Sequence, residues 1–153
     1  MREIRFSLRE APRPAPILGL SGLAPFLGLA LAAALASGEE IQIADRARYL
    51  LGVWGGLILS FLGGCRWGFA AAGLGEGVSW WTLTVGVAPS LIGLVALGVG
   101  GREALWIAAL GLIAAFAADV SLTRARGAPA WWPALRLPLT VVAALSLMAG
   151  ALS

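Results

Sequence analysis

Apolar residues fill five long runs of this chain, and polar residues are confined to its ends and to short connections. A helix rises about 1.5 Å per residue, so roughly 20 apolar residues cross a hydrocarbon core of about 30 Å. No run alternates apolar and polar side chains as a half-buried strand does. The pattern therefore predicts five transmembrane helices, which cover Ile17–Ser37, Tyr49–Phe69, Trp80–Val99, Ala104–Leu122 and Ala134–Leu152.

The composition agrees with a membrane protein. Hydrophobic residues make up 59% of the 153 residues and charged residues 12%, against about 25% charged in a soluble domain. No part of the chain is long and polar enough to form a second domain. We expect an all-α integral membrane bundle in which residues 1–16 form a basic N-terminal tail and residues 17–153 a single membrane domain. The first connection, Gly38–Arg48, is expected to be a loop.

The arginines predict the orientation of the bundle. All eleven basic residues are Arg, and eight of them fall on the side of the N-terminus. Because positive residues stay in the cytoplasm, we expect the N-terminus inside and the C-terminus outside. Arg without Lys, together with much Ala, Gly and Leu, suggests a GC-rich bacterial genome and hence the bacterial inner (cytoplasmic) membrane. The basic pI of about 10.4 is then explained by anionic lipid, and not by nucleic acid.

One alternative concerns the first run. Ala34-Leu35-Ala36 before Ser37-Gly38 resembles a signal-peptidase site after a basic tail. The run is long for a signal sequence, however, and Pro25 interrupts it, so a membrane span is the favoured interpretation.

Tryptophans mark the predicted interfaces. An indole ring buries its apolar body and keeps its N–H wet, which suits the boundary between lipid and water. Trp106 lies at the predicted outer interface, whereas Trp54 falls inside the second run and is expected to pack. The residues expected as anchors on the cytoplasmic side are Trp67, Trp80, Trp81, Trp131 and Trp132.

Small residues recur every four positions in the second run. Residues four apart lie on one helix face, and a face without side chains lets another helix approach closely in lipid. We expect this helix-packing ridge to make the second helix the centre of the bundle, although a homodimer seam is an alternative that the sequence leaves open. The ridge consists of Gly52, Gly56, Ser60, Gly64 and Gly68.

Two prolines fall inside predicted spans. Pro25 and Pro89 each remove a backbone hydrogen bond and strain the preceding turn, so both predict helix kinks. Pro89 frees the carbonyl of Val85, and Ser90 beside it is expected to satisfy local polar groups. A broken helix can form a transport site, but structural kinks are commoner.

Buried charge is the most specific feature of the sequence. Arg66 and Asp119 lie near the cytoplasmic ends of two parallel spans, and Arg136 reaches a similar depth from the start of the last span. A carboxylate in lipid needs a partner, so we expect an ion pair of Asp119 with Arg66, Arg136 or both. The favoured interpretation is a structural pin between three helices. The alternative is a proton or ion relay.

Reactive chemistry has little support in the sequence. There is no His, which removes the commonest metal ligand and general base. Cys65 and Ser60 are possible nucleophiles, but no His or Lys is present to activate them. We therefore expect no enzyme activity, no metal site and no cofactor.

Four stretches resemble a known family. The longest runs from Leu57 to Gly68 (LILSFLGGCRWG), and the others are Gly19–Phe26, Pro89-Ser90-Leu91 and Arg136–Thr140. Together they resemble the membrane family of domain of unknown function 3429, which includes proteins like transmembrane protein 69. Members often carry His where this chain has Arg66. The resemblance implies a multi-pass membrane protein of bacteria or animal mitochondria, and it implies no established activity.

Two functions follow as hypotheses. The first is a non-enzymatic accessory or assembly subunit of a larger membrane complex, whose partners would be the lipid bilayer and other membrane-protein subunits. The alternative is a small carrier or channel that uses the kinked helices and the buried Arg–Asp pair. The sequence does not decide whether the protein forms a homo-oligomer.

Overall fold

The computed structural model describes residue 8, residues 10–36 and residues 41–153. Over this part of the chain it is all α-helical, without a strand. Five helical segments are long and apolar enough to cross a membrane, which confirms the predicted fold class. The helices are α1 (Pro14–Ser21), α2 (Ala24–Leu35), α3 (Ile41–Ala71), α4 (Trp80–Val99), α5 (Gly101–Arg124) and α6 (Trp132–Leu152), where α1 and α2 together form the first span.

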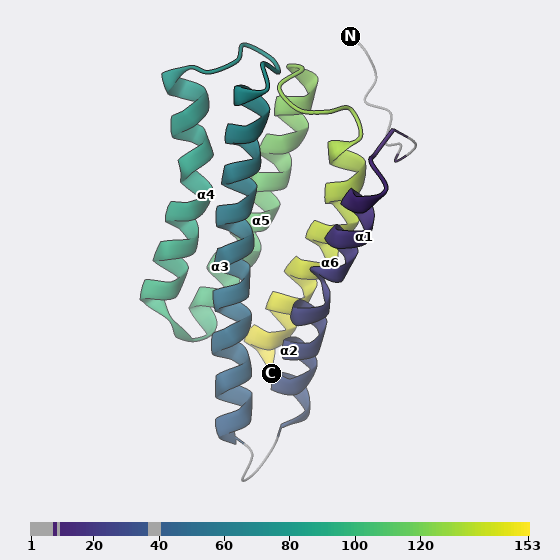
Figure 1. Cartoon of the computed structure of the whole chain (residues 1–153). Helices are drawn as coiled ribbons and strands as arrows, with labels where there is room; N and C mark the ends of the chain where they lie inside the picture. Colours follow the sequence, from purple (N-terminus) through teal and green to yellow (C-terminus); the bar gives the residue numbers. More distant parts are fainter. Residues whose placement is uncertain (1–7, 9, 37–40) are drawn as a thin grey trace.

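Helix α3 is the centre of the bundle. It packs against α2, α4, α5 and α6, and Figure 1 shows it running the full height of the molecule. Successive spans run in opposite directions, so the start of α1 and the end of α6 lie at opposite ends (Figure 1). We call these the N-tail end and the C-terminal end. The starts of α4 and α6 and the ends of α3 and α5 lie at the N-tail end.

Helix α3 begins eight residues earlier than the sequence predicted. The loop expected over Gly38–Arg48 is wrong from Ile41 onward, because residues 41–48 already belong to α3. Ala and Arg are good helix formers, and charge ends a membrane span without ending a helix. With 31 residues, α3 is roughly 46 Å long and extends past a hydrocarbon core at its start. Residues 37–40, which include the Ser37-Gly38 half of the possible cleavage site, and Arg2, Arg5 and Arg9 lie outside the described residues, whereas Ala34 and Leu35 belong to α2.

The first span is broken where a kink was expected. Helix α1 ends at Ser21 and α2 starts at Ala24, with Pro25 in its first turn. Proline lacks an N–H and its ring crowds the carbonyl four residues before it. The indole N–H of Trp54 donates to the carbonyl of Gly22 at the break, over 3.2 Å. Trp54 therefore packs inside the bundle and ties α3 to the first span.

Helix α4 continues through Pro89 without a break. The hydroxyl of Ser90, which was expected to satisfy local polar groups, donates to the hydroxyl of Ser60 in α3 over 3.1 Å. A further proline, Pro138, lies inside α6 and was not predicted as a kink.

The glycine ridge faces three different surroundings. A Cβ added at Gly52 would lie 3.5 Å from Leu105 of α5, whereas one at Gly56 would lie 3.5 Å from Gly93 of α4. Cβ atoms added at Gly64 and Gly68 would meet nothing within 4 Å, and both residues are exposed. The prediction that these last two face a neighbouring helix of the same chain is therefore wrong.

The close contact with α4 continues instead at Gly63. A Cβ there would collide with the carbonyl oxygen of Gly86. Gly93 is equally tight, because a Cβ on it would come within 2.9 Å of the carbonyl oxygen of Gly56. Two glycine pairs thus bring the backbones of α3 and α4 together.

The tryptophans divide into exposed and packed residues. Trp80 and Trp81 are 92% and 77% exposed, as an interface anchor requires. Trp131 is half-buried and packs edge-on against Trp132. Trp132 is only 8% exposed and packs edge-on against Phe69 as well, so it is a core residue and its assignment as an anchor is wrong.

Trp67 is partly exposed and also contacts α4. It is 45% exposed, but its indole N–H donates to the carbonyl of Leu83 in α4 over 3.0 Å. A Cβ on Gly86 would lie 2.5 Å from the Trp67 ring, so the ring packs against α4 where this glycine leaves room.

Candidate functional site

The three buried charges lie at one depth near the N-tail end. Asp119 comes five residues before the end of α5, Arg66 five residues before the end of α3, and Arg136 four residues after the start of α6. At the helical rise, each is roughly 6–8 Å from its helix end. The fold therefore brings together three residues, one each from α3, α5 and α6. These are the residues that the sequence analysis selected by their predicted depth in the membrane.

Asp119 takes one arginine on each carboxylate oxygen. The Nε of Arg66 donates to Oδ1 over 3.1 Å, and the Nε of Arg136 donates to Oδ2 over 3.2 Å. Asp119 is 1% exposed, Arg136 4% and Arg66 8%. We call these three residues the charge cluster. It links the central helix to the last two helices through the interior of the bundle.

The charge cluster carries more positive than negative charge. Two guanidinium groups against one carboxylate leave a formal charge of +1. The Nη2 of Arg136 has no hydrogen-bond partner among the described residues. The Nη2 of Arg66 lies 3.1 Å from Oδ1 but is not aligned for a hydrogen bond. Buried donors are therefore in excess, and Asp119 is the sole carboxylate that balances them within the described cluster.

Two further buried polar atoms on α6 have no hydrogen-bond partner among the described residues. The indole N–H of Trp132 and the hydroxyl of Thr140 are buried without a partner in the described part of the chain. They lie four residues before and four residues after Arg136, on the same face of α6. The cluster thus sits within a short polar strip of one helix.

The chemistry of the cluster suits binding and structure better than proton transfer. A guanidinium stays charged at physiological pH and cannot pass a proton on. Cys65 is adjacent in sequence to Arg66 and is a free, half-buried thiol. Ser60 is engaged with Ser90, farther along α3. The described residues contain no group of three His, Cys, Asp or Glu side chains placed to hold a metal ion.

The fold and the charge cluster define a multi-pass helical membrane protein with an ion-paired interior. The chain belongs to the family described as Protein of unknown function (DUF3429), which matches residues 11–152. It is 37% identical over 145 residues to Transmembrane protein 69 of Xenopus tropicalis. That alignment covers 93% of this chain and 55% of the relative, so the chain spans about half the length of the frog protein. No solved structure matches the chain.

Proposed function

We propose that this protein is a non-enzymatic subunit of the membrane, which acts as an accessory or assembly factor of a larger membrane complex. The observation that supports the proposal is the isolation of the charge cluster. It pins three helices together at the N-tail end, and apolar side chains separate it from the other end of the bundle. Within the described residues, such an interior favours a structural role over a transport path or a reactive centre.

A long apolar stretch of the interior separates the charge cluster from the C-terminal end. Leu59 and Leu105 are 0% exposed, and Leu112 is 1% exposed. The pocket at the C-terminal end reaches Gly52 of α3, which lies 14 residues before Arg66, or roughly 21 Å along the helix. An interior of this kind favours a protein that acts by contacting other subunits through its outer surface.

The outer surface offers a place to test this proposal. Leu57 and Phe61 are 54% and 64% exposed, and Gly64 and Gly68 continue the same open side of α3. A leucine at Gly64 would obstruct any helix of another subunit docked there, whereas a Cβ at this position meets nothing within 4 Å in this chain. Gly28 of α2 provides a matched control, because a Cβ there also meets nothing within 4 Å.

We expect the tagged protein, extracted from native membranes in a mild detergent, to migrate in a complex larger than a monomer or homodimer. Cross-linking and mass spectrometry should find the same membrane subunit in fixed stoichiometry in repeated preparations. Gly64→Leu should reduce this complex, whereas Gly28→Leu should not. Recovery of the protein alone, or solely as a homodimer, would contradict the accessory role.

The carrier remains the second candidate, favoured by a pocket that opens at the C-terminal end together with prolines inside α4 and α6. Purified protein in liposomes separates the two candidates. Solute or ion flux above that of empty liposomes, and lost in Asp119→Ala at equal folded amounts, would favour the carrier. The accessory role predicts no such flux.

We further propose that the bundle lies in the bacterial inner membrane with its N-tail end in the cytoplasm. The arginine bias of eight to three supports this orientation. Reporter fusions after Arg13 should then show a cytoplasmic position, and fusions after Ser153 a position across the membrane. Reporters on the same side would contradict a bundle of five spans, and exchanged sides would contradict the orientation alone.

A further inference from the structure

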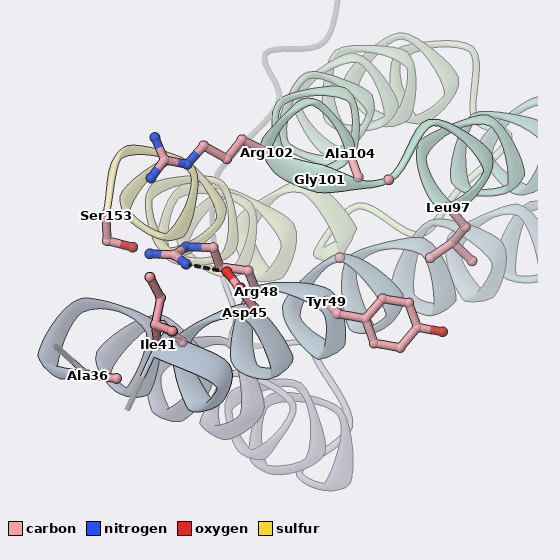
Figure 2. Close-up of a pocket in the computed structure, with 13 residues that line it drawn as sticks. Ala36, Ile41, Asp45, Arg48, Tyr49, Leu97, Gly101, Arg102, Ala104 and Ser153 are labelled. Atoms are coloured by element: carbon pink, nitrogen blue, oxygen red, sulfur yellow. Dashed lines mark hydrogen bonds and ion pairs between the residues drawn. The ribbon is translucent and has the colours of Figure 1, made fainter. Parts of the chain in front are cut away.

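A pocket of about 480 Å³ lies at the C-terminal end, far from the charge cluster. Helices α3 and α5 form its walls, together with the ends of α2, α4 and α6 (Figure 2). Its volume falls in the range of about 300–1,000 Å³ that is usual for small-molecule sites. Among the described residues, the charged side chains that line it are those of Arg48, Arg102 and Asp45. These side chains leave the pocket with a formal charge of +1.

Arg48 is built into the wall of the pocket. Its side chain is 14% exposed, whereas that of its partner Asp45 is 72% exposed. The pair is joined through Nη1 and Oδ1 over 2.9 Å (Figure 2). The Nε of Arg48 is buried and has no acceptor among the described residues. A guanidinium has five N–H donors, and the one side-chain hydrogen bond of Arg48 among the described residues is to Asp45.

Arg102 brings a second guanidinium from α5. Figure 2 shows its side chain extending from α5 toward the side of the view on which Arg48 and Ser153 lie. Within the described residues Arg102 forms no ion pair. Two separate helices therefore place cationic side chains at one hollow, and among the described residues a carboxylate pairs with Arg48 but not with Arg102.

The start of α5 adds positive potential. Gly100 and Gly101 adopt positive φ angles of 71° and 60° at this turn. The first backbone bond of the helix runs from the N–H of Ala104 to the carbonyl of Gly100 over 3.1 Å. The N–H groups of the preceding helical residues have no intrahelical acceptor, and such groups favour anions. Glu103 lies beside Gly101 and partly offsets this charge.

Part of the rim of the pocket is apolar. Ile41 and Leu97 line it and are 61% and 40% exposed. Tyr49, where the predicted second span begins, also lines it, so we expect the pocket near the level at which lipid headgroups meet acyl chains. A ligand with an anionic head and an apolar neighbour would match both parts of this surface.

We propose that this pocket binds a phosphate-bearing anion, held by Arg48, Arg102 and the start of α5. Guanidinium groups bind phosphate through paired, charge-assisted hydrogen bonds, and helix starts bind the same group. The phosphate can come from the headgroup of an anionic phospholipid or from a soluble phosphate. The site is independent of the accessory role, since it uses other residues at the other end of the bundle.

The test compares wild-type protein with two variants, Arg48→Gln and Arg102→Gln. Arg46→Gln is the matched control, because Arg46 is on the same helix, carries the same charge and does not line the pocket. Phosphatidylglycerol or phosphatidylcholine is added to the detergent-solubilised protein and retention is measured by native mass spectrometry. Inorganic phosphate is tested separately by thermal shift in lipid-free detergent.

We expect one phosphate-bearing ligand to bind with an affinity that falls at least about tenfold in either pocket variant and is unchanged in Arg46→Gln. Preference for phosphatidylglycerol without a response to inorganic phosphate identifies a headgroup site, and the reverse identifies a soluble phosphate. Binding of neither probe, or an equal loss in Arg46→Gln, would overturn the proposal.

A measurement on the wild-type protein covers the case in which a variant does not fold. The ligand should slow hydrogen exchange at the backbone amides of residues 101–103 and leave the end of α5 unchanged. Bound ligand without protection of these amides would also overturn the proposed site.

Discussion

Replacing Asp119 with alanine should destabilise the folded protein by roughly 3–5 kcal/mol, the usual cost of removing one partner of a buried ion pair. Asp119 is the carboxylate shared by Arg66 and Arg136. Its removal raises the formal charge of the cluster from +1 to +2 at 8% exposure or less. The folded fraction in detergent, followed by thermal unfolding and by size-exclusion yield, measures the effect.

Loss of one arginine should cost less than loss of the aspartate. Arg66→Met or Arg136→Met leaves one arginine paired with Asp119, so the cluster becomes neutral. Met also retains a long apolar side chain that fills part of the space. The excess of donors in the wild-type cluster therefore predicts an order of stability in which Asp119→Ala is the least stable of the three single variants.

The double variant Asp119→Ala with Arg66→Met provides the control for this interpretation. It carries the wild-type formal charge of +1 and should recover part of the stability lost in Asp119→Ala. Arg124→Met, at the exposed end of α5, should change the stability little. Strictly additive losses in the double variant would show that the three residues do not act as one cluster.

The spans were predictable from the sequence because lipid imposes a strict length on an apolar helix. The ends of the helices were less predictable. Hydropathy falls at Asp45, Arg46 and Arg48, but the helix begins before them at Ile41. Backbone hydrogen bonding does not depend on whether a side chain meets lipid or water, so the start of α3 could not be read from polarity.

The partners of Asp119 were predictable for a related reason. Depth in a membrane is fixed by residue number along a span, and a buried carboxylate leaves few choices of partner. The pocket at the C-terminal end was missed because Arg48 and Arg102 belong to different helices and entered the prediction only as two of the three arginines on the side opposite the N-terminus. Their separation along the chain gave no sign that α3 and α5 bring them to one hollow.

The glycine ridge was only partly predictable, because residues four apart do not form a line parallel to the helix axis. Each step of four advances 40° beyond a full turn, so the residues from Gly52 to Gly68 wind roughly 160° around α3. The ridge accordingly passes from α5 to α4 and then to the outside of the bundle. A spacing of seven drifts by only about 20°. Gly56 and Gly63 on α3 have this spacing, as do Gly86 and Gly93 on α4.

These geometries predict opposite results for two adjacent glycines. Gly63→Ala should destabilise the protein by roughly 1–3 kcal/mol, as overpacking of a tight contact does, because its Cβ would collide with the carbonyl oxygen of Gly86. Gly64→Ala should be neutral or slightly stabilising, since its Cβ meets nothing within 4 Å and alanine is the better helix former. Thermal unfolding of both variants in the same detergent makes the comparison.

Both variants make the same chemical change one residue apart, so the intrinsic preference of alanine for a helix cancels between them. Only the distance between α3 and α4 can then separate their stabilities. Gly93→Ala should resemble Gly63→Ala, because its Cβ would lie 2.9 Å from the carbonyl oxygen of Gly56 on the facing backbone. A greater loss of stability in Gly64→Ala than in Gly63→Ala would contradict this interpretation. The outer side of α3 would then have to be a packed interface, and the close contact of α3 with α4 through glycines seven residues apart would be wrong.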